Sequence, residues 1–75
     1  MATLRQKFGR RLKEIRIERR MTQEKFAELL DVSVDFLSLI ERGKNAPSFE
    51  TLDKIAKRLR MSVADLFNFS NRAIA

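Results

Sequence analysis

The sequence contains no cysteine and no histidine among its 75 residues. Disulfide bonds are therefore excluded, the usual zinc ligand sets are missing, and no imidazole is present for base catalysis. No activated nucleophile and no catalytic pair of carboxylates replaces them in a recognisable pattern. We therefore expect no metal site, no cofactor and no enzymatic activity.

Long hydrophobic runs are also absent, and the first twenty residues are charged. A membrane-spanning helix and a secretory signal both need a continuous apolar stretch, so neither is predicted, and we expect a cytoplasmic protein. Residues 1–75 are expected to form one domain. A domain of this size buries only about 60% of the surface that it exposes when unfolded, and it leaves little room for a small-molecule site.

Acidic residues are scarce at the start of the chain. The sequence has 16 Lys and Arg against 10 Asp and Glu, which gives a net charge of +6. Eight basic and two acidic residues within residues 1–20 account for all of this excess. A basic helix is often only a solvated face; the alternative is that it attracts a polyanion.

Only one proline interrupts the chain, and apolar residues recur at helical spacing. We predict an all-α bundle of five helices at about residues 3–19, 23–30, 34–42, 49–59 and 63–68. Candidate N-caps for the last four helices are Thr22, Ser33, Ser48 and Ser62. The fourth helix carries an apolar stripe of Phe49, Leu52, Ile55, Ala56 and Leu59.

Residues 22–43 are the most informative segment, because two short amphipathic helices are joined there by a tight turn at Asp31. Such a helix-turn-helix leaves its second helix exposed, and that helix suits the major groove of DNA. The side of this second helix that is predicted to face the core consists of Val34, Leu37, Ile40 and Glu41.

Glu41 is unusual on that inner face, because a buried carboxylate is costly without a cation. Arg16 follows Leu12 by four residues at the margin of the apolar face of the first helix. Its planar guanidinium matches a carboxylate in two parallel hydrogen bonds. We predict a largely buried ion pair between Arg16 and Glu41; the alternative is that both are ordinary solvated charges.

The outer side of the second helix is predicted to meet the bases. Asp35 and Leu39 lie opposite the core, with Phe36 and Ser38 at the flanks. Asp35 can accept a hydrogen bond from a cytosine amino group, and Leu39 or Val34 can contact a thymine methyl group. Alternatively, Asp35 only stabilises the helix N-terminus, and Leu39 and Phe36 are surface or core-edge residues.

Contacts with the DNA backbone are predicted at both ends of the helix-turn-helix. Gln23 and the free amide groups at the start of its first helix, after Thr22, can bind one strand. Arg42, Lys44 and Asn45 can reach phosphates near the end of the second helix. Each residue is a weak signal alone, and their grouping around one helix strengthens the prediction.

With these residues in place, residues 8–67 resemble the phage-repressor and Cro-like helix-turn-helix family, also called the xenobiotic-response-element regulators. The residues that carry the resemblance are Gly9, Arg16, Thr22, Gln23, Ala27, Val32, Ser33, Leu37, Ser38, Ile40, Glu41, Gly43, Pro47, Ser48, Thr51, Leu52, Ile55 and Ala56. The resemblance implies a five-helix, lambda-repressor-like DNA-binding domain. It also implies a repressor or activator of transcription that usually acts as a homodimer on a two-fold symmetric operator.

Position by position, the resemblance assigns the phosphate-gripping glutamine to Gln23 and the buried ion pair to Arg16 and Glu41. The base-reading positions that it implies are Ser33, Val34, Asp35, Ser38 and Leu39. Arg20 and Asp31 depart from the family, because relatives commonly have glycine at both positions. Asp tolerates a left-handed backbone better than most residues, so the change at Asp31 is mild.

The leading interpretation is a sequence-specific regulator of double-stranded DNA, with two copies spaced by about one helical turn, ~34 Å. Too little chain follows the fourth helix to cover every apolar surface, so dimer contacts are predicted at Leu66, Phe67, Phe69 and Ile74. The second interpretation is a protein-interaction module, such as an antitoxin, that uses Phe36 and Leu39.

Overall fold

The computed structural model describes residues 1–69, and that range contains helices and no β-strand. The five helices are α1 (Leu4–Glu18), α2 (Gln23–Leu30), α3 (Val34–Glu41), α4 (Phe49–Leu59) and α5 (Val63–Leu66). The predicted all-α bundle is therefore confirmed, and α2 and α4 have the predicted bounds. The predicted range of α5 was too long, because the chain leaves the helix at Phe67, the C-cap residue. None of the helices within residues 1–69 is both long enough and apolar enough to cross a membrane.

Each of the five helices is preceded by a serine or threonine whose hydroxyl oxygen accepts a hydrogen bond from the backbone N–H three residues later. These caps are Thr3, Thr22, Ser33, Ser48 and Ser62, with donor–acceptor distances between 3.0 and 3.2 Å. At Thr3 the capping box is complete, because the side-chain oxygen of Gln6 accepts the Thr3 N–H at 2.8 Å. Caps of this type stabilise a helix by about 1 kcal/mol each, and they are local enough to be recognised in sequence.

Several helices end at a residue with a left-handed backbone. The φ angle is 58° at Arg20, 59° at Asp31, 57° at Arg60 and 73° at Gly43. Arg20 and Asp31 are the two positions at which the resemblance implies glycine, and the left-handed φ angle found at both is one that glycine adopts most readily. α1 ends at Glu18, and the chain turns at Arg20.

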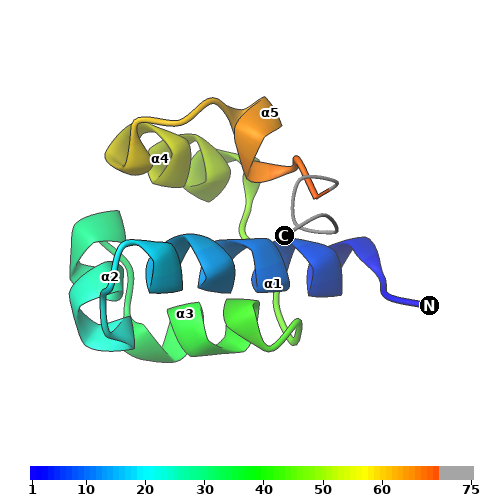
Figure 1. Cartoon of the computed structure of the whole chain (residues 1–75), viewed down its shortest axis with the longest axis horizontal. Helices are drawn as coiled ribbons and strands as arrows, with labels where there is room; N and C mark the ends of the chain where they lie inside the picture. The colour runs from blue at the N-terminus through cyan, green and yellow to red at the C-terminus, as the bar shows by residue number, and fades with distance from the viewer. Residues whose placement is uncertain (70–75) are drawn as a thin grey trace.

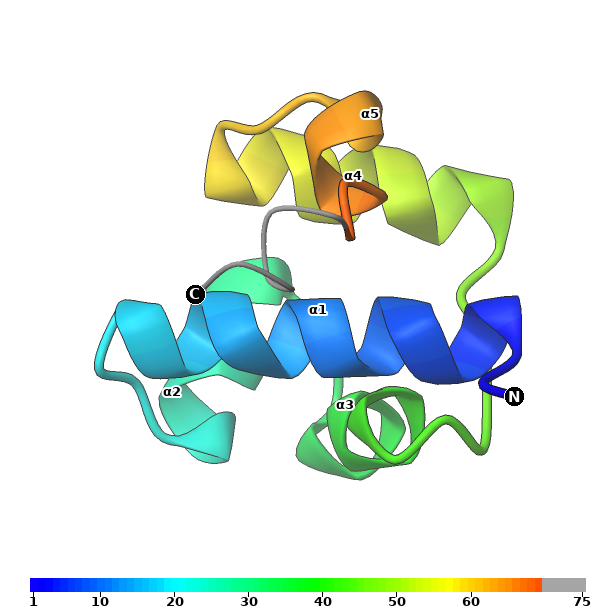
Figure 2. The ribbon, with the colours of Figure 1, turned by 45° about the vertical axis from the view of Figure 1, so that its right-hand side comes forward.

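All five helices pack around one core. α1 lies across the front of the views in Figures 1 and 2, with α3 below it and α4 and α5 above it, and it contacts α3 and α5. The largest fully buried side chains come from every helix and are Leu12, Phe26, Leu30, Leu37, Ile40, Ile55, Leu59 and Leu66. Phe49 differs from its predicted place in the apolar stripe of α4, because it begins the helix and is 86% exposed.

α1 and α3 approach each other closely at Gly9. A Cβ atom on Gly9 would overlap the backbone oxygen of Ile40 and lie 3.0 Å from the backbone oxygen of Glu41. Because glycine lacks that atom, the backbone of α3 can rest directly on α1. Gly9 therefore fixes the position of the last turn of α3 relative to α1.

Candidate nucleic-acid interface

α2, the turn after it and α3 form the predicted helix-turn-helix, and α4 holds the turn in place. Asp31 adopts the left-handed conformation, and the next N–H, that of Val32, donates to the backbone oxygen of Ala27 at 3.0 Å. The Lys54 ammonium of α4 donates to the backbone oxygen of Asp31 at 2.8 Å. Lys54 and Arg58 also lie 3.7 and 3.9 Å from the Asp31 carboxylate. The angle between α2 and α3 is thus supported from outside the motif.

The inner face of α3 packs as predicted except at its first residue. Leu37 and Ile40 have no exposed surface, and Glu41 is also buried. Val34, which was predicted to lie on the inner face, is 36% exposed. The reason is that α3 rests on α1 near Ile40, so its first turn extends beyond that contact.

Glu41 is the centre of a buried polar network that joins α1, α2 and α3. Arg16 Nε donates to Glu41 Oε2 at 2.8 Å, and Arg16 Nη2 donates to Oε1 at 3.1 Å. Gln23 Nε2 donates to the same Oε1 at 3.0 Å. Arg16 Nη1 also donates to the backbone oxygen of Met21, at 3.1 Å. The structure therefore brings Arg16 and Glu41 together, and the buried carboxylate is fully compensated.

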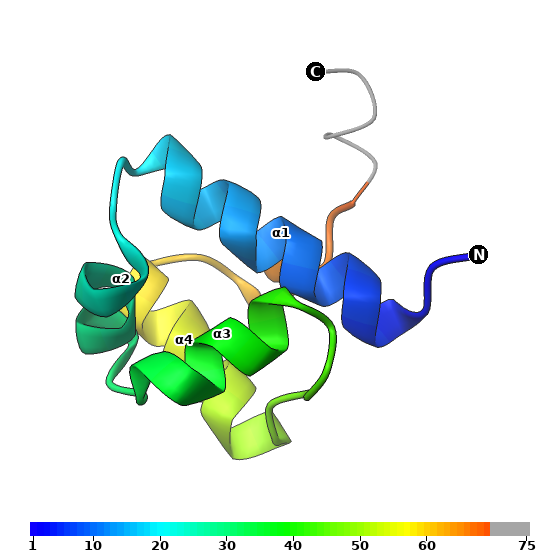
Figure 3. The same cartoon turned by 90° about the horizontal axis from the view of Figure 1, so that it is seen from below.

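The outer face of α3 is uncovered by any other helix of the described chain. Seen from below, α3 lies nearest to the viewer, with α4 behind it (Figure 3). Ser33 and Asp35 are exposed, and Ser38 and Leu39 are half-buried at the sides of the helix. Phe36 is also half-buried, but it differs from Ser38 and Leu39 because it packs against the core. Phe36 is therefore a core-edge residue, which was one of the two readings left open by the sequence.

The residues predicted to bind phosphate lie at both ends of this face. Thr22, Arg42, Lys44 and Asn45 are exposed. Gln23 is half-buried, and one N–H of its amide group donates to Glu41. A glutamine amide has two N–H donors, so one remains for a ligand. The Glu41 contact fixes the side chain of Gln23 at the start of α2.

The comparisons with known proteins agree with this geometry. A helix-turn-helix family model matches residues 12–66. The control protein C.BamHI of Bacillus amyloliquefaciens is 36% identical over 64 residues, which cover 84% of this chain and 79% of that protein. The chain belongs to the phage-repressor and Cro-like helix-turn-helix family. Its members are DNA-binding regulators of transcription, and this regulator is therefore not an enzyme.

Two further relatives of this helix-turn-helix regulator show the range of the family. The transcriptional regulator DdrOP3 of Deinococcus deserti is 40% identical over 60 residues, which cover 80% of this chain but only 46% of that protein. The crystal structure of the clp gene regulator ClgR from C. glutamicum superposes with a TM-score of 0.82 at 32% identity, covering 100% of this chain and 97% of that one. This chain spans about half the length of DdrOP3, so what the rest of that protein does is not transferred.

The predicted dimer residues of the regulator are only partly available. Leu66 was predicted at the interface, but it has no exposed surface because α5 inserts it into the core. Phe67 is half-buried and stacks on Phe8 with a ring-centroid distance of 5.0 Å. Phe69, also half-buried, lies 6.0 Å from Phe67. Ile74 lies outside the described residues.

Two arginines of the basic first helix have a structural role that the sequence did not reveal. Arg11 Nη2 donates to the backbone oxygen of Asp65 at 3.0 Å, and Arg19 Nη2 donates to that of Leu59 at 2.8 Å. These bonds satisfy carbonyl groups at the ends of α5 and α4. The partners lie 54 and 40 residues away in sequence, so no local signal could have indicated them.

Proposed function

We propose that this regulator binds a specific two-fold symmetric operator as a homodimer, with α3 of each copy in the major groove. The observation that carries the proposal is the uncovered outer face of α3, whose inner face is held by Gly9 and by the Arg16–Glu41 network. A major groove about 12 Å wide admits an α-helix. Two copies spaced by one helical turn would read half-sites ~34 Å apart.

Base reading is assigned to the exposed first turn and the outer side of α3. The residues assigned are Ser33, Val34, Asp35, Ser38 and Leu39. The exposure of Val34 supports its contact with a thymine methyl group, because an inward-facing side chain would not reach a base. Phe36 is removed from the predicted contacts, since its packing against the core gives it a supporting role.

Backbone contacts are assigned to the residues that flank this face. Thr22 and Gln23 stand at the start of α2, where the first amide groups of the helix point outward and favour an anion. Arg42, Lys44 and Asn45 follow α3 and are exposed. Contacts at both ends of α3 would fix the register of the helix in the groove. We also propose that the regulator acts in the cytoplasm, the location expected from the sequence.

An apolar patch formed by Leu4, Pro47 and Phe49 supports self-association. Phe49 is 86% exposed and Leu4 is 61% exposed, and both line an apolar groove together with Phe8 and Phe67. The exposed ring and the groove adjoin each other, so a second copy related by a two-fold axis could insert its own Phe49 while it receives the first. This patch replaces Leu66 in the proposed interface and retains Phe67 at its edge.

A protein-interaction role through Phe36 and Leu39 has less support than DNA binding. Phe36 packs against the core, so Leu39 is the one residue of the predicted pair that would contact a protein partner. Energetically important interface residues tend to cluster in well-packed centres, and one half-buried leucine does not form such a cluster.

Selection of bound duplexes from a random pool, followed by measurement of the mass of the complex, tests the proposed function. We expect an inverted repeat bound by two copies, with an affinity that falls roughly a thousandfold or more between 50 and 200 mM salt if six or more phosphates are contacted. Absence of any complex at low salt would refute DNA binding. A single copy on an asymmetric site would refute only the homodimer.

A further inference from the structure

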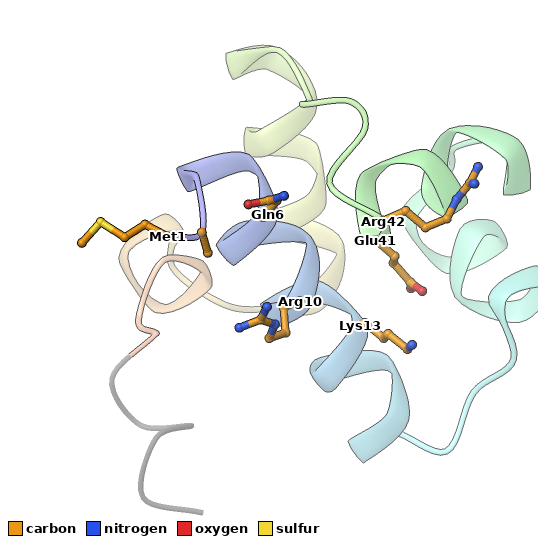
Figure 4. A pocket seen from close by; sticks show the side chains of 7 residues that line it. Met1, Gln6, Arg10, Lys13, Glu41 and Arg42 are labelled. Atoms are coloured by element: carbon orange, nitrogen blue, oxygen red, sulfur yellow. The ribbon is translucent and has the colours of Figure 1, made fainter.

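A groove beside the last turn of α3 gathers positively charged side chains from two helices (Figure 4). Its walls include Gln6, Arg10 and Lys13 of α1, and Glu41 and Arg42 at the end of α3. We call it the α1/α3 groove. Gly9 brings the two helices into contact at this point, so Arg10 and Lys13 are held next to the end of the base-reading helix.

The α1/α3 groove carries an uncompensated positive charge. Arg10, Lys13 and Arg42 are exposed, and none of them forms an ion pair with another residue of the range 1–69. Glu41 is the acid in the wall of the groove, and its two carboxylate oxygens already accept hydrogen bonds from Arg16 and Gln23. These three cations line one groove in which no carboxylate is free to balance them, so the groove favours an external anion.

Arg10 and Lys13 differ in this respect from Arg11 and Arg16 of α1 and from Arg19, the C-cap residue. Arg16 is used by Glu41, and Arg11 and Arg19 are used by backbone carbonyl groups. Arg10 and Lys13 are three residues apart, which places them on neighbouring positions of one helix surface. Their side chains are therefore available on the side of α1 that adjoins α3.

We propose that the α1/α3 groove binds phosphates of the DNA backbone alongside the base-reading helix. The inference rests on the proposed function, because it requires α3 to lie in the major groove. An α-helix with its side chains is about 10–12 Å wide and nearly fills a groove of about 12 Å, so the DNA backbone passes close to the ends and flanks of the helix. In this arrangement the DNA backbone is contacted at two places. Near the start of α2 the contacts come from Thr22 and Gln23. Near the end of α3 they come from Arg10, Lys13 and Arg42.

The position of the groove favours a DNA phosphate over a free anion. The chain continues from Arg42, in the wall of the groove, to Lys44 and Asn45, which are also exposed. Arg10 and Arg42 carry planar guanidinium groups, which bind phosphate oxygens in two parallel hydrogen bonds. Such contacts hold the protein in register and carry no sequence information.

The test compares two double variants with the same loss of charge. Arg10→Gln/Lys13→Gln removes two cations from the groove. Lys57→Gln/Arg60→Gln removes one cation from α4, where Lys57 pairs with Asp53 at 3.1 Å, and one from the exposed C-cap residue of α4; neither lines the groove. Affinity for the selected operator duplex is measured by fluorescence anisotropy between 50 and 200 mM salt, and thermal unfolding verifies that both variants are folded.

We expect the groove variant to bind roughly tenfold to a hundredfold more weakly at 100 mM salt. The slope of log K against log salt should fall by about 2, because each lost phosphate contact removes about 0.9. The order of preference among duplexes should not change. The control variant should keep the parent slope, and Arg10→Lys in place of Arg10→Gln should restore about half of the lost slope, because Lys13→Gln is still present.

Equal losses of slope in the groove variant and the control would overturn the groove assignment and leave DNA binding intact. Displacement of duplex from the parent but not from the groove variant by inorganic phosphate, at constant ionic strength, would identify a small-anion site instead. If the parent itself binds no duplex at low salt, the regulator function and this inference fail together. A neutral methylphosphonate at the contacted position should weaken the parent and leave the groove variant unchanged.

Discussion

The guanidinium of Arg16 and the carboxylate of Glu41 are joined by hydrogen bonds of 2.8 and 3.1 Å, although the residues lie 25 positions apart. The side chains are only 14% and 3% exposed. Gln23 adds a bond from the start of α2. One carboxylate thus connects the helix that supports the motif, the first helix of the motif and the end of the base-reading helix.

Replacement of Glu41 by alanine should be strongly destabilising. It would leave Arg16 buried without its anion, and removal of one partner of a buried pair costs about 3–5 kcal/mol. Urea denaturation of Glu41→Ala measures the loss. The double variant Arg16→Met/Glu41→Leu should recover much of the stability, since it removes both charges and retains apolar volume. If Glu41→Ala were as stable as the parent, the pair would be no more than two solvated charges.

Replacement of Gly9 by alanine should also destabilise the fold, although alanine has the higher helix propensity. Alanine favours a helix interior by about 1 kcal/mol over glycine. At Gly9, however, the added Cβ would overlap the backbone of Ile40, and relief of such overpacking costs about 1–3 kcal/mol. We expect a net loss in the free energy of unfolding. Lys7→Ala, on the exposed side of α1, is the control and should change it by less than about 0.5 kcal/mol.

Replacement of Arg20 by glycine should have the opposite sign. Arg20 has a φ angle of 58°, which costs a residue with a side chain about 1–2 kcal/mol, whereas glycine adopts it freely. Glycine loses more entropy on folding, so a net gain of about 0.5–1 kcal/mol is expected, seen as a higher midpoint of thermal unfolding. Arg60→Gly, at 57°, should behave similarly. A lower midpoint for both would show that the arginine side chains stabilise these turns.

The sequence predicted those features that depend on neighbouring residues or on one obligatory partner. The caps at Thr22, Ser33, Ser48 and Ser62 are of the first kind, because each hydroxyl bonds an N–H three residues away. The contact between Arg16 and Glu41 is of the second kind. A carboxylate on an apolar helix face requires a cation, and Arg16 lies at the margin of the apolar face of α1, four residues after Leu12.

Features that depend on how far the core extends were not predictable from periodicity. Leu66 and Phe49 are both apolar residues near helix starts or ends, yet one is fully buried and the other is 86% exposed. Val34 has the helical spacing of an inner residue but lies beyond the contact between α3 and α1. Gly9 could be recognised as part of the family pattern, while its role required the position of the Ile40 backbone.

Replacement of Phe49 by alanine should weaken self-association without unfolding the protein. The side chain contributes little to the core, so its loss removes apolar contact area mainly between copies. Sedimentation at tens of micromolar should show a dimer for the parent and a monomer for Phe49→Ala. Ile17→Ala is a matched control, because Ile17 is also an exposed apolar residue, at 56%, and it does not line the apolar groove. Dimers of equal strength in both variants would rule out this patch as the interface.

Asp35 and Lys44 should respond differently when each is replaced, because only one of them is assigned to a base. Asp35→Asn exchanges a group that accepts from cytosine for an amide that pairs with adenine, so selection from the random pool should change at one position of each half-site. A discrimination of about 1–3 kcal/mol corresponds to roughly 5–150-fold. Lys44→Gln should weaken binding to all duplexes by a similar factor and lower the salt slope by about 1. Uniform weakening by both variants would mean that Asp35 acts only on the stability of α3 or on its overall attraction to DNA, and base reading would then have to come from Ser33, Val34, Ser38 and Leu39.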